Sequence, residues 1–269
     1  MLTANPLPSL FIPHGGGPCF FMPDPGGAWT GMAAFLRSLP SRLTSFLAAP
    51  PKAILLVSGH WATDGFAFTG AAKPPLIYDY FGFPPETYAI RYDAPGDPAL
   101  AERAANLLAQ SGLTAIVDNT RGLDHGVFVP LKVAFPDASI PVVEMSVDAR
   151  LDPALHLAAG KALAPLRNEG VAIIASGMSF HNMRGYNDPR FTASSDAFDA
   201  WLSESAAMDG PARAKRLTQW ESGPAARLSH PTAEHLLPLM VAAGASANPG
   251  RKIYSEQVLK TAIAGFEFA

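Results

Sequence analysis

Five of the seven histidines stand where side chains from distant parts of the chain could meet: His14, His60, His125, His181 and His235. The histidines at 14, 60 and 181 follow short apolar segments that predict buried strands, the one at 125 lies in a loop, and the one at 235 lies on a predicted helix. Residues just beyond the carboxyl ends of parallel strands converge on the crevice where open α/β sheets bind ligands. Neutral imidazole is the commonest protein metal ligand, and several together suit Zn, Fe, Cu or Ni better than Mg or Ca. The placement favours a metal site, although any one of these histidines alone is more typical of a hydrogen-bonded loop residue.

The elements that would position these residues alternate between strands and helices. Apolar runs bounded by turn residues predict strands over 9–13, 52–58, 140–145 and 171–176, and helical patterns occupy 28–39, 98–109, 153–166 and 232–243. Asp97 and Asp152 each precede a proline and are expected to cap two of these helices. Continuous apolar strands alternating with helices indicate an α/β fold, with a mostly parallel sheet covered on both faces. The tail, 252–268, alternates more weakly and is expected to add antiparallel edge strands.

Composition excludes several classes of protein. The chain has 269 residues, a formal net charge of -3 and 16% charged residues, which argues against a nucleic-acid binder. Its longest apolar runs fall far short of the ~20 residues of a membrane span. The single cysteine, Cys19, excludes an intrachain disulfide and fits a reducing compartment. Residues 1–9 lack the pattern of a signal peptide. We therefore expect a cytoplasmic protein in which residues 1–269 form a single catalytic domain, without nucleic-acid or membrane partners.

The histidines lie in distinct local motifs. These are His14-Gly15-Gly16-Gly17-Pro18, Ser58-Gly59-His60-Trp61, Asp124-His125-Gly126, His181-Asn182 and Pro231-Thr232-Ala233-Glu234-His235-Leu236-Leu237-Pro238. Their combination and order resemble the class III extradiol ring-cleavage dioxygenases, over about residues 10–238. Within that superfamily the chain most resembles the 4,5-DOPA dioxygenase extradiol-like branch, as does the segment from Ile77 to Gly96.

The resemblance implies a mononuclear non-haem metal, a small aromatic diol substrate and O2. Fe(II) is the metal implied for activity, and Zn(II) is the alternative, since it is often found in bacterial DOPA-type members. By position, His14, His60 and His235 match the metal ligands. His181 matches a fourth active-site histidine, which is either an additional ligand or the catalytic base. His125 matches the histidine that contacts substrate; we expect His181 to act as base and His125 to donate a proton later.

Three local features bear on the details. The Gly15-Gly16-Gly17-Pro18 loop is one residue longer than in many relatives and is expected to move Cys19 and Phe20 toward the pocket. The second motif has Gly59 where alanine is usual. Other branches of the superfamily use a glutamate as third ligand. Because adjacent residues on a helix point about 100° apart, we favour His235 over Glu234 in that role.

Other interpretations stay open from the sequence. A zinc-dependent hydrolase on the same scaffold, or a non-catalytic metal-binding protein, would also use clustered histidines. Four aromatic residues could line a flat pocket or simply pack in the core: Trp61, Tyr80, Phe81 and Phe83. His156 and His230 fall outside the pattern and are expected in a helix and a turn. The sequence fixes neither the catechol, the ring position cleaved, nor the oligomeric state.

Overall fold

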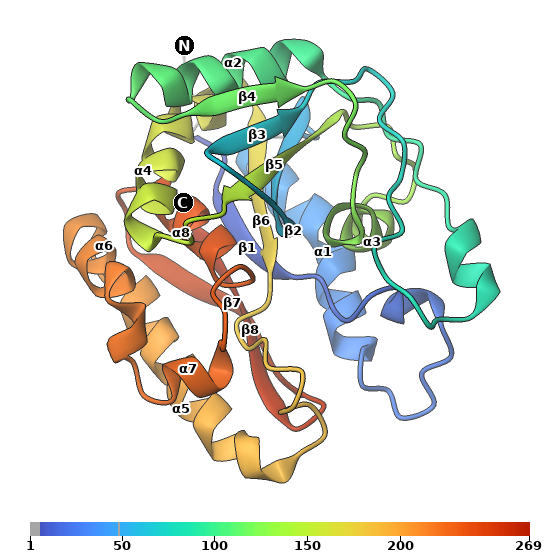
Figure 1. Cartoon of the computed structure of the whole chain (residues 1–269), viewed down its shortest axis with the longest axis vertical. Helices are drawn as coiled ribbons and strands as arrows, with labels where there is room; N and C mark the ends of the chain where they lie inside the picture. Colours follow the sequence, from blue (N-terminus) through green and yellow to red (C-terminus); the bar gives the residue numbers. More distant parts are fainter. Residues whose placement is uncertain (1–5, 48) are drawn as a thin grey trace.

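A mixed sheet of eight strands organises the chain (Figure 1). The computed structural model describes residues 6–47 and 49–269, and the strands follow the order β4-β3-β5-β2-β6-β1-β8-β7 across the sheet. Their bounds are β1 Ser9–Pro13, β2 Ala53–Thr63, β3 Phe66–Thr69, β4 Ala115–Asp118, β5 Val142–Asp148, β6 Val171–Gly177, β7 Gly250–Val258 and β8 Thr261–Phe268. The prediction of a single α/β domain around a mostly parallel sheet is confirmed.

The four central strands, β5, β2, β6 and β1, run parallel to one another. β3 and β8 flank them in the antiparallel direction. The tail forms antiparallel strands, as predicted: β7 lies at one edge of the sheet, and β8 pairs with both β7 and β1. At the opposite edge, β3 and β4 were not predicted, because each is only four residues long.

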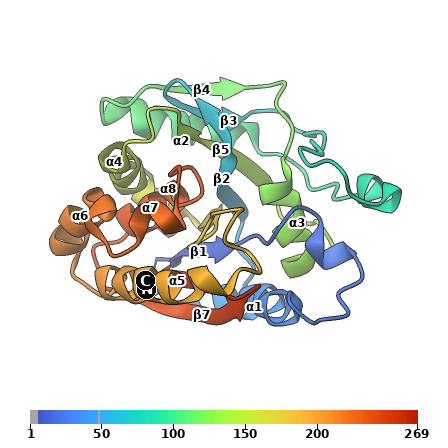
Figure 2. The same cartoon turned by 60° about the horizontal axis from the view of Figure 1, so that its bottom comes forward.

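Helices cover both faces of the sheet. The α-helices are α1 Thr30–Leu47, α2 Pro98–Gln110, α3 His125–Ala134, α4 Pro153–Leu163, α5 Thr192–Ala206, α6 Gly210–Thr218, α7 Ala226–Ser229 and α8 Leu237–Gly244. Short 3-10 helices span Cys19–Phe21, Pro85–Ala89, Ala164–Glu169, Pro189–Phe191 and Trp220–Ser222. Figure 2 shows α2, α4 and α8 on one side of the central strands, with α1 and α3 on the other.

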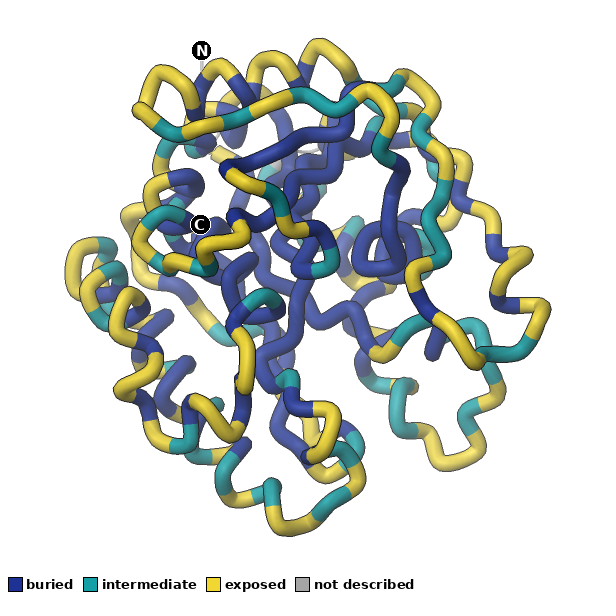
Figure 3. The backbone as a smooth tube through the Cα atoms, in the orientation of Figure 1, coloured by how far each residue is buried: buried dark blue, intermediate teal, exposed yellow. Residues whose placement is uncertain are grey.

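The core consists of two apolar layers that the central strands separate. Successive side chains of a strand point to opposite faces. On β2, Leu55 and Val57 accordingly pack with α2, α4 and α8, whereas Ile54 and Leu56 pack with α1 and α3. The central strands are dark blue in Figure 3, whereas many positions of the outer helices and loops are yellow. None of the helices in the described ranges is long and apolar enough to cross a membrane.

Helix starts follow the capping prediction in two places. Asp97 accepts a hydrogen bond from the backbone N–H of Leu100, and Asp152 accepts one from that of Ala154, each preceding a proline in the first turn. Such caps typically contribute about 1 kcal/mol each. The predicted end of the second of these helices was too late, because the α-helix stops at Leu163 and continues as a 3-10 turn.

Three predictions for the histidine segments were wrong. His125 is the first residue of α3 and does not lie in a loop. β2 continues to Thr63, so His60 lies on the strand rather than after it, and the pairing of β2 with β5 shifts register between Val57 and Ala62. Such irregularities locally redirect side chains. The helix predicted from residue 232 begins only at Leu237, with Pro238 in its first turn. Proline there lacks the N–H that a helix start leaves free, so it marks the beginning of the helix.

Candidate active site

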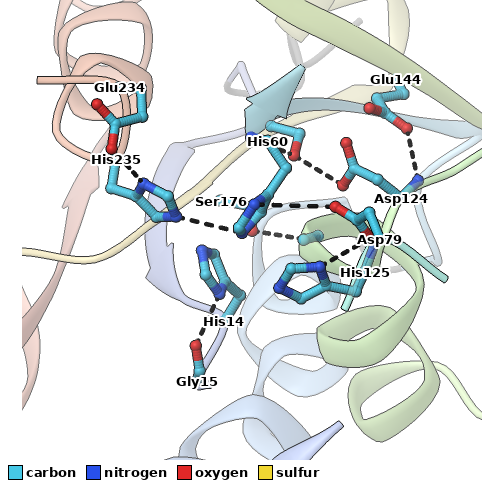
Figure 4. A network of polar contacts seen from close by, with 12 residues as sticks. His14, Gly15, His60, Asp79, Asp124, His125, Glu144, Ser176, Glu234 and His235 are labelled. Carbon is cyan, nitrogen blue, oxygen red and sulfur yellow. Dashed lines mark hydrogen bonds and ion pairs between the residues drawn. The ribbon is translucent and has the colours of Figure 1, made fainter. Parts of the chain in front are cut away.

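Three histidines from different elements come together at one end of the central strands (Figure 4). His14 follows β1, His60 lies on β2, and His235 lies in the turn before α8. Their ring centroids are 4.6 to 5.3 Å apart. The Nε2 atoms of His60 and His235 are 3.2 Å apart. One nitrogen from each of the three rings lies within 4.8 Å of the others, a spacing that could hold a metal ion.

His14 presents one nitrogen with no partner. Its Nδ1 donates a hydrogen bond to the Gly15 carbonyl at 2.9 Å, which leaves Nε2 with a free lone pair. That Nε2 is buried and has no hydrogen-bond partner among the described residues, a state that costs about 1–3 kcal/mol. Gly15 has a φ of +83°, and a Cβ there would lie 2.5 Å from the Cys19 sulfur, so the turn requires glycine. A buried nitrogen of this kind fits a metal ligand.

Carboxylates stand behind the other two rings. Asp79 Oδ2 is 3.8 Å from Nδ1 of His60, and Glu234 Oε1 is 3.2 Å from Nδ1 of His235. A carboxylate that accepts a hydrogen bond from one ring nitrogen directs the other nitrogen to an ion, and Glu234 does this for His235. Asp79 is too far from His60 for a hydrogen bond. The two residues at 234 and 235 occupy a turn, so the helical 100° separation does not apply, and Glu234 contacts the His235 ring.

Burial keeps these imidazoles neutral. Burial, with a smaller effect of the neighbouring His125 and His181, lowers the pKa of His14 to about 3. Burial likewise lowers the pKa values of His60 and His235 well below 6.5, with other histidines adding to the shift. Neutral imidazole is the form that binds a metal.

His125 is held by Asp79. It opens α3, and Asp79 Oδ1 accepts hydrogen bonds from both its backbone N–H, at 2.9 Å, and its Nδ1–H, at 2.8 Å. Burial alone would raise the pKa of Asp79, but these hydrogen bonds prevail and lower it. The ring centroid of His125 is 3.9 Å from that of His60. The Nε2 of His125 is therefore left as an acceptor beside the three-histidine group.

His181 approaches from the loop after β6. Its ring stacks on that of His235, with centroids 3.5 Å apart and planes 10° apart, and its Nδ1 is 3.7 Å from Glu234 Oε1. Burial lowers its pKa, and the Glu234 charge opposes that shift. Among the described residues, the metal-capable group that contains His14 and His60 includes His235 and not His181.

The aromatic residues proposed to line a pocket differ in burial and in their contacts with the histidines. Tyr80 is buried, packs edge-to-face on His125 with centroids 5.7 Å apart, and contacts Phe83. Phe81, in contrast, is 91% exposed. Trp61 is buried beneath the guanidinium of Arg121.

Cys19 and the two other histidines are buried. Cys19 and Phe20 pack against Gly15, next to His14. His156 accepts a hydrogen bond from the backbone N–H of Asp148, and His230 bonds the Ser179 carbonyl.

Sequence reasoning missed the role of Asp79. The residue stands in the 77–96 segment that was singled out only for its resemblance, and it lies 46 positions from His125. No spacing within the sequence connects the two residues. Only the loop geometry brings this carboxylate to the imidazole.

Comparison with known proteins gives this site a family. Residues 9–267 match the model described as the catalytic LigB subunit of aromatic ring-opening dioxygenase. The chain belongs to the LigB family of class III extradiol dioxygenases. The predicted family is confirmed, and the protein is an oxidoreductase, an extradiol ring-opening dioxygenase, rather than a zinc hydrolase.

Several proteins named as dioxygenases are similar in sequence to this LigB family member. The chain is 41% identical over 257 residues to the dioxygenase tasH of Hapsidospora irregularis, covering 89% of this chain and 78% of that protein. It is 43% identical over 216 residues to a 4,5-DOPA dioxygenase extradiol of Beta vulgaris, covering 79% and 78%. The Escherichia coli protein of that name is 35% identical over 252 residues, covering 91% and 87%. A crystal structure of an uncharacterized E. coli K12 protein superposes with a TM-score of 0.76 at 28% identity, covering 98% of this chain and 100% of that one.

Proposed function

We propose that this dioxygenase opens the ring of a catechol-type substrate at one metal ion held by His14, His60 and His235. Fe(II) is the metal proposed for activity, and Zn(II) is the alternative occupant. The observation that carries the proposal is the buried, unpartnered Nε2 of His14, together with the 3.2 Å separation between Nε2 of His60 and Nε2 of His235. Bound there, the metal would supply open positions for the two catechol oxygens and O2, and would favour the deprotonated catechol.

The chain's own residues then manage protons. We assign removal of a catechol proton to His181, which is neutral because burial lowers its pKa and which is partly accessible. A base contributes most when its pKa lies near the working pH, and imidazole comes close without a large shift. The alternative role for His181 is that of a fourth metal ligand. In that case His125 would have to serve alone.

His125 is assigned to substrate binding and to the later return of a proton. Asp79 holds its Nδ1–H, so Nε2 faces the substrate as an acceptor until it gains a proton. Once His125 is protonated, the adjacent carboxylate stabilises the imidazolium, and the same Nε2 becomes a donor. The buried Tyr80 packs against this ring and limits its movement.

The substrate to test first is DOPA, because two of the relatives above carry the name 4,5-DOPA dioxygenase extradiol. Protein loaded with Fe(II) under anaerobic conditions is mixed with each of several catechols, and O2 uptake and product absorbance are followed. We expect O2 uptake equal to the catechol consumed. No uptake with any catechol, in protein that has bound iron, would contradict the proposal. Metal analysis of protein purified without added metal decides between Fe and Zn.

A further inference from the structure

A mostly buried polar cluster lies behind the histidines, outside the roles proposed above. It consists of Ser58, Arg121, Asp124 and Glu144, and is called the carboxylate cluster below. The side chains of Asp124 and Glu144 have no exposed surface. Figure 4 shows both carboxylates on the far side of His60 from His14.

The hydroxyl of Ser58 joins two elements of the site. It donates a hydrogen bond to Asp124 Oδ1 at 2.8 Å and accepts one from the backbone N–H of His60 at 3.2 Å. Asp124 in turn precedes His125, and its carbonyl accepts the backbone N–H groups of Val127 and Phe128 that begin α3. One oxygen atom therefore connects the backbone of His60 to the residue that starts the His125 helix.

Close packing leaves little freedom at this junction. A Cβ on Gly126 would lie 2.7 Å from the Ser58 Oγ and 2.9 Å from Cδ2 of His60. The hydroxyl of Ser176 on β6 also donates to the Gly126 carbonyl, at 2.5 Å. The first turn of α3 is thus pressed against β2 and β6 next to both imidazoles.

Charge in the cluster is balanced by one arginine. Arg121 donates to Asp124 Oδ2 at 3.1 Å and is 3.7 Å from Glu144 Oε1. Its guanidinium also lies over the ring of Trp61, on β2, at 5.0 Å. Burial, and then the charge of Asp124, raises the pKa of Glu144 well above its usual value. Burial thus favours the neutral form of Glu144, and Asp124 is the carboxylate that accepts a hydrogen bond from Arg121.

We propose that Ser58 and Asp124 are positioning residues, which set the ring of His60 toward the metal and that of His125 toward the substrate. The inference rests on the proposed function, because it assumes those roles for the two histidines. Groups that hold metal ligands or their neighbours typically change metal affinity or activity 10–100-fold when they are altered. The cluster joins β2 and α3 through hydrogen bonds to both histidine-bearing segments, so its effect would be directed at the site rather than spread over the fold.

The first test is Ser58→Ala, with Ser146→Ala as the matched control. Ser146 is also fully buried on a central strand, and its hydroxyl also accepts a backbone N–H, that of Ala67, and contacts a side-chain oxygen, that of Thr63. Affinity for Zn²⁺ is measured by competition with a chelator, kcat and KM by O2 uptake with iron, and stability by thermal unfolding. We expect Ser58→Ala to weaken Zn²⁺ binding and lower kcat by about 10-fold each, while Ser146→Ala lowers only the unfolding midpoint. Equal metal affinity and kcat in the two variants would overturn the proposal.

A second pair of variants serves if Ser58→Ala does not fold. Asp124→Asn removes the charge that pairs with Arg121. Glu144→Gln keeps the shape of a carboxyl group whose neutral form is favoured by burial. We expect Asp124→Asn to lose metal affinity and kcat as Ser58→Ala does, and Glu144→Gln to stay within about twofold of the unaltered protein. If Asp124→Asn retains metal affinity and kcat as Glu144→Gln does, the positioning role is overturned.

The two proposals fail in different ways. Zn²⁺ binding needs no catechol, so a protein that binds Zn²⁺ but consumes no O2 with iron contradicts the proposed function. The positioning role is then still decided by the Zn²⁺ affinities of the variants. A protein that binds no Zn²⁺ at all contradicts both.

Discussion

The two sides of the active site hold their histidines in different ways. On the α3 side, His125 donates two hydrogen bonds to Asp79, at 2.8 and 2.9 Å, and the carboxylate cluster is hydrogen-bonded to the backbone next to it. On the α8 side, His181 rests its ring on His235 and faces Glu234 only at 3.7 Å. The difference is consistent with different proposed roles for His125 and His181. A fixed imidazole suits substrate binding, and a less constrained, partly exposed one suits exchange of a proton with solvent.

The largest effect is expected from removing His60, a proposed metal ligand that contacts histidines on both sides. His60→Ala deletes one of the three imidazoles, and its ring contacts both His125 and His235. We expect stoichiometric metal binding to be lost and kcat to fall by more than about 10³-fold, since the metal supplies both substrate activation and orientation. Metal content after dialysis and O2 uptake measure this. Chelation of the unaltered protein should have the same effect and be reversed by Fe(II), which a merely unfolded protein would not allow.

His181→Ala tests the α8 side. With the ring gone, metal binding should persist through the three remaining histidines, while kcat falls by about 10²–10⁴-fold, the usual contribution of a general base. Bound metal is determined by elemental analysis, beside O2 uptake. Loss of the metal in this variant would mean that His181 is a ligand, and the contrast drawn between the two sides would disappear.

Asp79→Asn tests the α3 side. The amide can no longer enforce a protonated Nδ1 on His125 or stabilise the imidazolium, so we expect kcat to fall by about 10–100-fold with metal content unchanged. The exposed Asp64→Asn is the control for loss of a carboxylate. Wild-type kcat in Asp79→Asn would show that the orientation of His125 does not depend on this hydrogen bond.

The smallest effect is expected from Glu234→Gln. Burial lowers the pKa of His181 and the Glu234 charge raises it, so loss of that charge lowers the pKa further. Because the base must be neutral to accept a proton, the acid limb of the kcat/KM profile should move to lower pH, by less than about one unit given the 3.7 Å separation. A shift to higher pH, or none, would show that Glu234 does not act on the base.

Much of this fold could be predicted because its core strands are continuously apolar. β1 matches its predicted range, and β6 extends only one residue further, to Gly177. β3 and β4 were not predicted because a strand of four residues is too short to show a clear hydrophobic periodicity. β4 is also only partly buried, which weakens its apolar pattern further.

The histidines of the candidate site could be predicted from the sequence, but the residues and backbone geometry that hold them in place could not. Five histidines were located through their motifs, and the structure brings them together. The register shift in β2 that carries His60, and the late start of α8 at Leu237, depend on packing between elements that the local sequence does not encode. Asp79 and Glu144 were missed because their partners lie far away in the sequence.

The central claim is that the rings of His14, His60 and His235 share one metal ion. The most direct measurement is a crystal structure of Zn²⁺-loaded protein with anomalous scattering recorded at the zinc edge. The account predicts a single strong peak within about 2.1 Å of one nitrogen of each of these three rings. A peak bonded to His181 and Glu234 without His14, or to His125 and Asp79, would contradict it.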